Sequence, residues 1–418
     1  MPASGLKSVI VLLFGVAILS IGHGLHGTLV SVRSSAEGFS AATTGMIMSG
    51  YFLGLLISST VTPRIVQSVG HIRVFAAFAS VVSTAVLLVP LWIDPVWWFL
   101  MRFVSGMCMS GLFIVCESWL NSTTTNTNRG RLLSLYMIVS YGANGLGQLL
   151  LNISDSSGFV RFIVVSALLS LALVPLTLVP TESPSLAGTR PVGLRQIYKA
   201  SPLAVVGAFA NGLGQSAFFS MGAVFGLMQG MPLSYVSLMM ALPPIGVILS
   251  QYPAGLLSDR YDRRSIIMVM SALAVIVAAA CMIAGLASPI LLIVGITAFG
   301  TVALPIYSLV LAHANDHIGS DQILGASAKL ILLYGLGAMA GPFIVGQLMD
   351  GFGPRGYLLH LICVYGAIAG FAFWRRTRKP EDIKAKAEEV FIAGPNTTPV
   401  VAQTMAEGGS AQVSKPAA

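Results

Sequence analysis

The chain has 418 residues, of which 55% are hydrophobic and only 9% are charged, and its formal net charge is +8. Soluble domains carry about 25% charged residues, so this composition, with a mean hydropathy of +0.84, excludes a soluble globular protein and predicts a protein of the lipid bilayer.

Twelve apolar stretches are long enough to cross a bilayer, since a helix needs about 20 residues to span a hydrocarbon core of about 30 Å. Helices are expected because every backbone group must be paired inside the membrane. The first stretch exceeds the short apolar core of a signal peptide and ends in no small-residue cleavage pattern, so we interpret it as a span. The predicted spans are 9–32, 45–66, 74–91, 97–119, 132–152, 162–179, 204–228, 237–257, 266–286, 290–312, 327–348 and 357–374.

The spans divide into two sets of six that resemble each other. GQLL at 147–150 in the fifth span returns as GQLM at 346–349 in the eleventh, and PRIVQSVGHIR after the second span aligns with GLLSDRYDRRS after the eighth. We therefore predict an all-α integral membrane protein with two pseudo-symmetric six-helix bundles at residues 1–180 and 201–376. A polar linker is expected at 181–200 and a disordered tail at 377–418.

The positions of the basic residues predict the orientation. Of the 23 Lys and Arg residues, only Arg33, Arg161 and Arg355 fall on the side opposite the termini, and only Arg102 lies well inside a span, since Arg64 and Lys329 stand at the ends of theirs on the side of the termini. By the positive-inside rule, both termini, the linker and the tail are cytoplasmic. The positive charge therefore reflects topology, and no nucleic-acid partner is expected.

Three motifs resemble those of the major facilitator superfamily. GLLSDRYDRR at 255–264 resembles its signature loop, Arg102-x-x-x-Gly106 its second motif, and Gly337-x-x-x-Gly341-Pro342 its glycine-proline motif. The segments GHGLHGTLVSVRSSAEGFS from Gly22, ESWLN and NRGRLLSLYM from Glu117, and AHAND from Ala312 resemble the bacterial YcaD-like branch. The resemblance covers about residues 8 to 376 and implies a twelve-helix secondary transporter of the bacterial inner membrane. Gly106, Gly337, Gly341 and Pro342 are expected at close helix contacts.

The loop at 255–264 is predicted to form part of a cytoplasmic gate. Asp259 would face a positive helix N-terminus or an arginine of the other half, with Gly255 permitting close helix approach. Alternatively, the basic residues of the loop only fix the topology. In the first-half copy, Gln67 and Ile72 replace the expected acid and base, so only one of the two gates is predicted to be charged. The residues assigned to this gate are Gly255, Asp259, Arg260, Arg263, Arg264, Arg129 and Arg131.

Ionisable residues inside the membrane are costly and are therefore candidate site residues. His23 and His26, three residues apart in the first span, and Arg102 in the fourth reach similar depths. The resemblance implies that the first, fourth, seventh and tenth spans line a cavity, so these three side chains are expected to meet there, with a histidine accepting the transported proton. Alternatively, each histidine only bonds a neighbouring helix. Glu117 is either a proton carrier or a gate partner of Arg129 or Arg131.

Asn211, Gln215 and Phe219 in the seventh span and Tyr307 in the tenth suit a mostly neutral, partly aromatic solute, with Asn144 and Gln148 of the fifth span as further candidates. Amides also serve simply to hold helices together.

The predicted function is alternating-access transport of a small organic solute, coupled to protons, with uptake of a vitamin-like or aromatic metabolite favoured, for example a flavin. Proton-antiport efflux of drugs or metabolites is the alternative, and a transporter-derived membrane sensor is a remote one. Neither a catalytic constellation nor metal-ligand spacing is found, so no enzyme activity, cofactor or metal is expected. The expected partners are a small-molecule substrate, protons and the lipid bilayer, and a monomer is expected.

Overall fold

The computed structural model describes residues 3–122, 129–153, 158–177, 193–318 and 322–378, and these fold almost entirely into helices. A first group of helices, α1 to α7, is followed by a second group, α8 to α15. The first group comprises α1 (Ala3–Ala36), α2 (Ala41–Val69), α3 (His71–Leu88), α4 (Pro95–Ser122), α5 (Arg129–Leu149), α6 (Val160–Leu171) and α7 (Leu173–Thr177), with 3₁₀ turns η1 (Val89–Leu91) and η2 (Leu150–Asn152). The second comprises α8 (Leu194–Ala200), α9 (Pro202–Met228), α10 (Leu233–Arg260), α11 (Arg263–Ala287), α12 (Pro289–Ala303), α13 (Ile306–His317), α14 (Ile323–Phe352) and α15 (Arg355–Arg378).

The helices have the length and composition of membrane spans. Within the described residues, 11 helical segments are long and apolar enough to cross a bilayer. The remaining predicted span corresponds to α5, whose sequence contains polar residues such as Tyr136, Asn144 and Gln148, and α5 packs against α1 and α10. The all-α membrane fold predicted from the sequence is confirmed.

Two predicted spans are interrupted. The span at 290–312 consists of α12 and α13, separated by Leu304 and Pro305, because proline has no N–H for the helix ladder and its ring crowds the preceding turn. The span at 162–179 likewise consists of α6 and α7, and Pro175 lies just beyond that break. Of the linker predicted at 181–200, residues 194–200 form the short helix α8 and 181–192 lies outside the described residues, as does the predicted tail from 379 onward.

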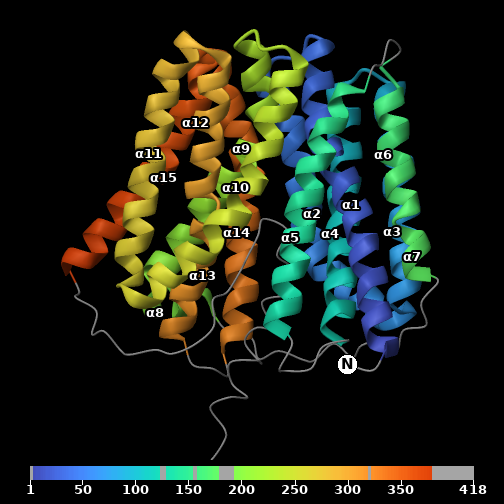
Figure 1. Cartoon of the computed structure of the whole chain (residues 1–418), viewed down its shortest axis with the longest axis horizontal. Helices are drawn as coiled ribbons and strands as arrows, with labels where there is room; N and C mark the ends of the chain where they lie inside the picture. The colour runs from blue at the N-terminus through green and yellow to red at the C-terminus, as the bar shows by residue number, and fades with distance from the viewer. Residues whose placement is uncertain (1–2, 123–128, 154–157, 178–192, 319–321, 379–418) are drawn as a thin grey trace, which may run out of the picture.

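The two groups lie side by side with their long helices roughly parallel (Figure 1). The start of α1 and the end of α15 lie at the same end of the bundle, drawn at the bottom of Figure 1, which we call the lower end. The opposite end, where α1 leads into α2, is called the upper end. An even number of crossings between the termini accounts for this arrangement.

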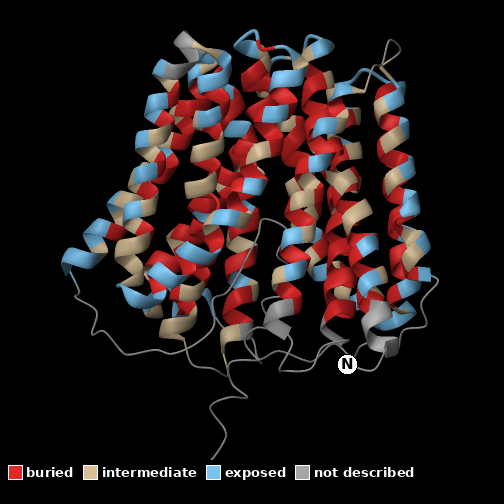
Figure 2. Ribbon diagram, in the orientation of Figure 1, coloured by how far each residue is buried: buried red, intermediate tan, exposed pale blue. Residues whose placement is uncertain are grey.

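Buried residues face the interior of the bundle and exposed ones lie on its periphery (Figure 2). The periphery includes large apolar side chains such as Leu249, Ile276 and Ile283, which are 72%, 64% and 74% exposed. Large exposed apolar surface is unfavourable in water, whereas lipid chains would cover it. The surface therefore has the character of a lipid-facing belt.

Glycines bring the long helices into backbone contact. A Cβ atom on Gly106 of α4 would lie 1.9 Å from the carbonyl oxygen of Tyr51 in α2, and one on Gly337 of α14 would lie 2.1 Å from that of Phe209 in α9. Gly341 similarly faces the Leu213 carbonyl of α9 at 2.4 Å. Any side chain at these positions would push the helices apart, so glycine sets the helix spacing around the centre.

Candidate functional site

A central cavity lies between the two groups of helices. Its lining residues come from α1, α2, α4 and α5 of the first group and from α9 and α14 of the second. Aromatic rings make up much of the wall and amides supply polar groups. The rings are Tyr51, Phe52, Tyr136, Tyr141, Phe219 and Tyr334, and the amides are Asn144, Gln148 and Gln215. Such a mainly apolar wall with a few polar groups is typical of a small-molecule site.

Arg102 and the two histidines of α1 lie together at this cavity. Arg102 is buried, with 3% of its surface exposed, and its Nη1 lies 3.5 Å from Nδ1 of His26. Its guanidinium also lies over the ring of Tyr51, 4.7 Å from the ring centroid. The ring of His23 packs against the same tyrosine, with ring centroids 5.8 Å apart. Arg102 and His23 line the cavity, while His26 contacts the guanidinium from a fully buried position.

Gln215 joins α9 to α14 and to the break between α12 and α13 at the cavity wall. Its Nε2 donates to the carbonyl of Leu304 at 3.0 Å, and its Oε1 accepts from the hydroxyl of Tyr334 at 3.2 Å. The Leu304 carbonyl is available to a side chain because the helix is interrupted at Pro305. The break between α12 and α13 thus positions Gln215, and nothing in the local sequence of α9 indicates this contact.

Two expected cavity residues lie elsewhere. Asn211 is fully buried and donates to the Gly207 carbonyl of its own helix at 2.8 Å. Tyr307 packs against Tyr334 with ring centroids 4.7 Å apart. Among the described residues, neither belongs to the cavity lining. In this conformation one turn of helix separates Asn211 from Gln215, and Tyr307 packs behind Tyr334. Their contact with a solute stays a prediction.

Several lining residues were not found by sequence reasoning. Tyr51, Tyr136 and Tyr334 line the cavity, and Thr28 donates to Oε1 of Gln148 at 2.5 Å, joining α1 to α5. A tyrosine within an otherwise apolar span could have indicated these lining residues, because a buried hydroxyl needs a hydrogen-bond partner.

Glu117 is buried in the lower half of α4. The hydroxyl of Tyr136 donates to its Oε1 at 3.0 Å, so the carboxyl group touches a side chain that also lines the cavity. Arg129 and Arg131, its predicted partners, lie at the start of α5, and their side chains fall outside the described part of the structure.

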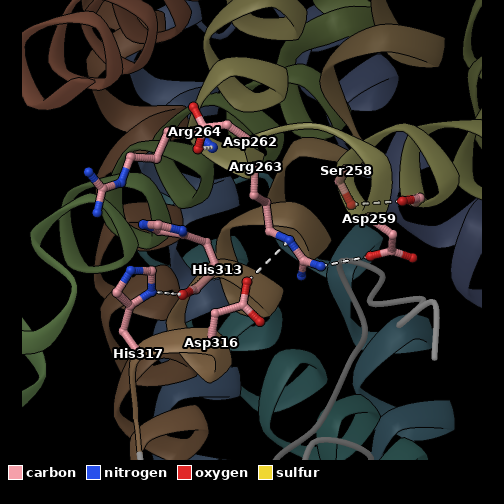
Figure 3. A network of polar contacts seen from close by, with 9 residues as sticks. Ser258, Asp259, Asp262, Arg263, Arg264, His313, Asp316 and His317 are labelled. Carbon is pink, nitrogen blue, oxygen red and sulfur yellow. Dashed lines mark hydrogen bonds and ion pairs between the residues drawn. The ribbon is translucent and has the colours of Figure 1, made fainter. Parts of the chain in front are cut away.

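The charged residues of the loop at 255–264 form a network within the second group (Figure 3). Arg263 lies between two acids, with Nη2 at 2.7 Å from Asp259 of α10 and Nε at 3.4 Å from Asp316 of α13. Asp262 caps α11, accepting from the backbone N–H groups of Arg264 and Ser265 at 3.3 and 3.1 Å.

The remaining members of the predicted gate differ in their surroundings. Arg260 is exposed, whereas Gly255 is buried and its carbonyl accepts from the hydroxyl of Ser258 at 2.8 Å.

The upper ends of the two groups are packed together. Asp350 at the end of α14 accepts from the backbone N–H groups of Ala41 and Ala42, at 2.9 and 3.1 Å, at the start of α2. A Cβ on Gly45 would lie 2.1 Å from the Pro342 carbonyl oxygen, so α2 and α14 touch through their backbones. These contacts close the upper side of the cavity between α2 and α14.

Asn152 provides a second link at the upper end. Its Nδ2 donates to the hydroxyl of Ser237 in α10 at 2.7 Å, and a Cβ on Gly145 of α5 would lie 2.8 Å from the Ala241 carbonyl oxygen of α10. The pair α5 and α10 thus repeats the arrangement of α2 and α14 across the interface between the groups.

Two relatives cover most of the chain. An "Uncharacterized MFS-type transporter" of Yersinia pestis (strain Pestoides F) is 27% identical over 369 residues, which are 88% of this chain and 94% of the relative. The "Uncharacterized MFS-type transporter YcaD" of Escherichia fergusonii is 26% identical over 352 residues, 82% of this chain and 89% of the relative.

Solved structures share the fold. The nucleoside transporter NupG superposes with a TM-score of 0.73 at 14% identity, over 90% of this chain and 98% of that one. A bacterial homologue of the human lysosomal transporter Spinster gives 0.67 at 14% identity, over 98% and 99% of the two chains. The sequence model of the Major Facilitator Superfamily matches residues 12–322 and again 229–412. The chain therefore belongs to the major facilitator superfamily of membrane transporters.

Proposed function

We propose that the chain is a secondary active transporter that takes up a small, partly aromatic organic solute by alternating access, driven by protons. The observation that carries this proposal is the cavity itself, which is walled by helices of both groups and closed by direct packing of α2 on α14 at the upper end. A solute bound between two bodies can be exposed to either side as the bodies rock.

The lower end is assigned to the cytoplasm of a bacterium, with the protein in the inner membrane as a monomer. The scarcity of Lys and Arg in the upper connections supports this orientation through the positive-inside rule. The described state is then closed to the outside, and Asp259 pairs with Arg263 of its own group. In the opposite state, Asp259 would exchange this partner for the start of α5, which carries Arg129 and Arg131.

His23 and His26 are the proposed proton acceptors. They lie beside Arg102, the residue that would couple protonation to the solute. Glu117 is assigned to the lower side of the pathway, where its bond to Tyr136 connects the carboxyl group to the cavity wall.

Transport by purified protein in liposomes tests the function. A panel of radiolabelled vitamins, nucleosides and aromatic metabolites is supplied outside, with the lumen made alkaline relative to the outside. Because reconstituted protein can insert in both directions, labelling of a cysteine introduced at the lower end, after Cys363 has been replaced, measures the fraction in each orientation. We expect accumulation of one metabolite class, abolished when a protonophore removes the gradient.

Three other results would contradict parts of the proposal. Accumulation of the solute that is unchanged by the protonophore would contradict proton coupling. Extrusion of unrelated lipophilic compounds from preloaded vesicles would favour efflux. Binding of a metabolite without any flux would favour a sensor.

A further inference from the structure

A buried arginine in the cavity has no acidic partner. Arg102 contacts His26 through Nη1 and the face of Tyr51 through its guanidinium. Within the part of the chain that the structure describes, no carboxylate pairs with it and its Nε has no hydrogen-bond partner. Burying a charge away from water is costly unless an opposite charge accompanies it. An uncompensated guanidinium at a binding cavity therefore indicates that the counter-charge comes from outside the chain.

The cavity wall supplies no such counter-charge. The described residues that line it include neither aspartate nor glutamate, and Arg102 is the one permanently charged side chain among them. The adjacent His23 offers a second polar atom, since its buried Nδ1 also has no partner in the described structure. When it carries the ring proton, this nitrogen donates a hydrogen bond. His23 and Arg102 both flank the ring of Tyr51, so the two groups face one region of the cavity.

Aromatic rings surround this polar region. Tyr51 and Phe52 come from α2, Tyr136 and Tyr141 from α5, and Phe219 from α9. Flat aromatic walls favour planar ligands through offset stacking and edge-to-face contacts. The polar groups at Arg102 and His23 would therefore bind one part of a ligand, and the aromatic walls would bind a planar part of the same ligand.

We propose that the transported solute is an aromatic monocarboxylate, with its carboxylate bound to Arg102 and to Nδ1 of His23 and its ring held among the aromatic side chains. The inference rests on the proposed transport function and narrows its substrate class. A guanidinium binds a carboxylate through paired charge-assisted hydrogen bonds. One permanent cation matches one negative charge, whereas a doubly charged phosphate ester would leave an excess of negative charge in the cavity.

Binding of matched acid and amide pairs tests this assignment. The probes are indole-3-acetate with indole-3-acetamide, phenylacetate with phenylacetamide, and nicotinate with nicotinamide, each titrated into the purified full chain by calorimetry. Tryptamine serves as the cationic counterpart of the indole pair. For at least one pair we expect the acid to bind about 10- to 100-fold more tightly than its amide, as expected for a hydrogen-bonded charge pair, and tryptamine not to bind.

Substitution then assigns the effect to one side chain. Arg102→Gln is expected to bring the ratio of the two affinities close to one, and Arg102→Lys to retain part of the wild-type ratio. Arg33→Gln is the matched control, because Arg33 pairs with Glu37 in an ion pair outside the cavity, and its ratio should equal that of the wild type.

An acid-to-amide ratio near one in the wild-type protein would overturn the inference, as would an unchanged ratio in Arg102→Gln or a panel in which no acid binds. The wild-type ratio decides the matter even where Arg102→Gln does not fold. The two proposals can fail separately. If amides are transported at the same rate as their acids, the transport function stands and the assignment of a carboxylate substrate fails. If acids bind through Arg102 but are never transported, the carboxylate site stands and the transport function fails.

Discussion

The contact between Asp350 and the start of α2 is expected to hold the upper ends of the two groups together. The carboxylate accepts from the backbone N–H groups of Ala41 and Ala42, at 2.9 and 3.1 Å, across the interface between the groups. These N–H groups belong to the first turn of a helix, where they have no partner within the helix and where the helix dipole attracts negative charge. Asp350→Ala removes both bonds while leaving the glycine contacts of α2 and α14 in place.

The size of the effect follows from the geometry. Losing a helix-capping side chain costs about 0.5–2 kcal/mol. Asp350 is exposed, so water and salt weaken its charge and a value of about 1 kcal/mol is appropriate. Because about 1.4 kcal/mol corresponds to a factor of ten in an equilibrium constant, the population open at the upper end should rise about fivefold. Asp350→Asn keeps an acceptor oxygen without the charge and should give a smaller rise.

Distances between spin labels at the upper end measure this population. Trp92 of the first group and Phe352 of the second are exposed, at 58% and 61%, and accept labels once the exposed Cys363 has been replaced. In Asp350→Ala, the fraction of long distances should increase about fivefold over the wild type.

Ser40→Ala provides the matched control. The Ser40 hydroxyl caps the same helix, accepting from Thr43 N–H at 3.1 Å, but this bond lies entirely within the first group. Its loss should weaken α2 without changing the distance distribution. An unchanged distribution in Asp350→Ala, or an equal change in Ser40→Ala, would refute the role of Asp350 in joining the groups.

Three further substitutions test other parts of the structure. Gly337→Ala should lower the melting temperature in detergent by several degrees, because its Cβ would lie 2.1 Å from a carbonyl oxygen of α9. Gly370→Ala, which has open space around it, should leave the melting temperature unchanged. Equal melting temperatures for the two variants would contradict the close packing at Gly337. Gln215→Leu should cost about 1–3 kcal/mol in chemical unfolding, since it leaves a buried carbonyl and a buried hydroxyl unpaired, and a neutral result would show that water replaces the amide. Asp259→Asn should change stability by less than about 1 kcal/mol, because its pair with Arg263 is partly exposed, yet reduce transport; transport at the wild-type rate would exclude Asp259 from the gate.

The fold could be predicted from the sequence because the bilayer constrains it so strongly. Span length, the need for paired backbone groups and the distribution of basic loops each follow from simple physical rules. The interruption at Leu304 could not be predicted in the same way. Pro305 precedes a new helix, but α10 contains Pro243, Pro244 and Pro253 and remains continuous. Proline is tolerated in membrane helices when neighbouring groups pair the freed backbone atoms, and such neighbours become known only from the packing.

The candidate site was predicted unevenly for a related reason. Arg102, His23 and His26 are noticeable in a sequence because a charged or titratable group within a span is expensive. Tyrosines and amides are common in spans, and their role depends on which face of the helix they occupy. Asn211 and Gln215 lie one turn apart on α9, yet Gln215 bonds to α14 and to the break between α12 and α13, whereas Asn211 bonds to its own helix. Such a difference arises from the neighbouring helices and is absent from the pattern of a single span.

The lower ends of the two groups use related contacts of different strength. In the first group, His71 at the start of α3 bonds through Nε2 to the hydroxyl of Ser118 in α4 at 2.9 Å, and both residues are buried. In the second, Arg263 at the start of α11 reaches Asp316 of α13 at 3.4 Å, with side chains 17% and 29% exposed.

By the repeat of the spans, these two contacts join corresponding helices. The buried neutral bond would leave polar atoms unpaired if it broke, which costs about 1–3 kcal/mol. Partly exposed ion pairs contribute only about 0–1 kcal/mol and can exchange partners at little cost, because water and other charges replace what is lost. A carrier must break contacts at this end in every cycle. The charged loop of the second group is therefore expected to change partners at a lower free-energy cost than the His71–Ser118 contact of the first group.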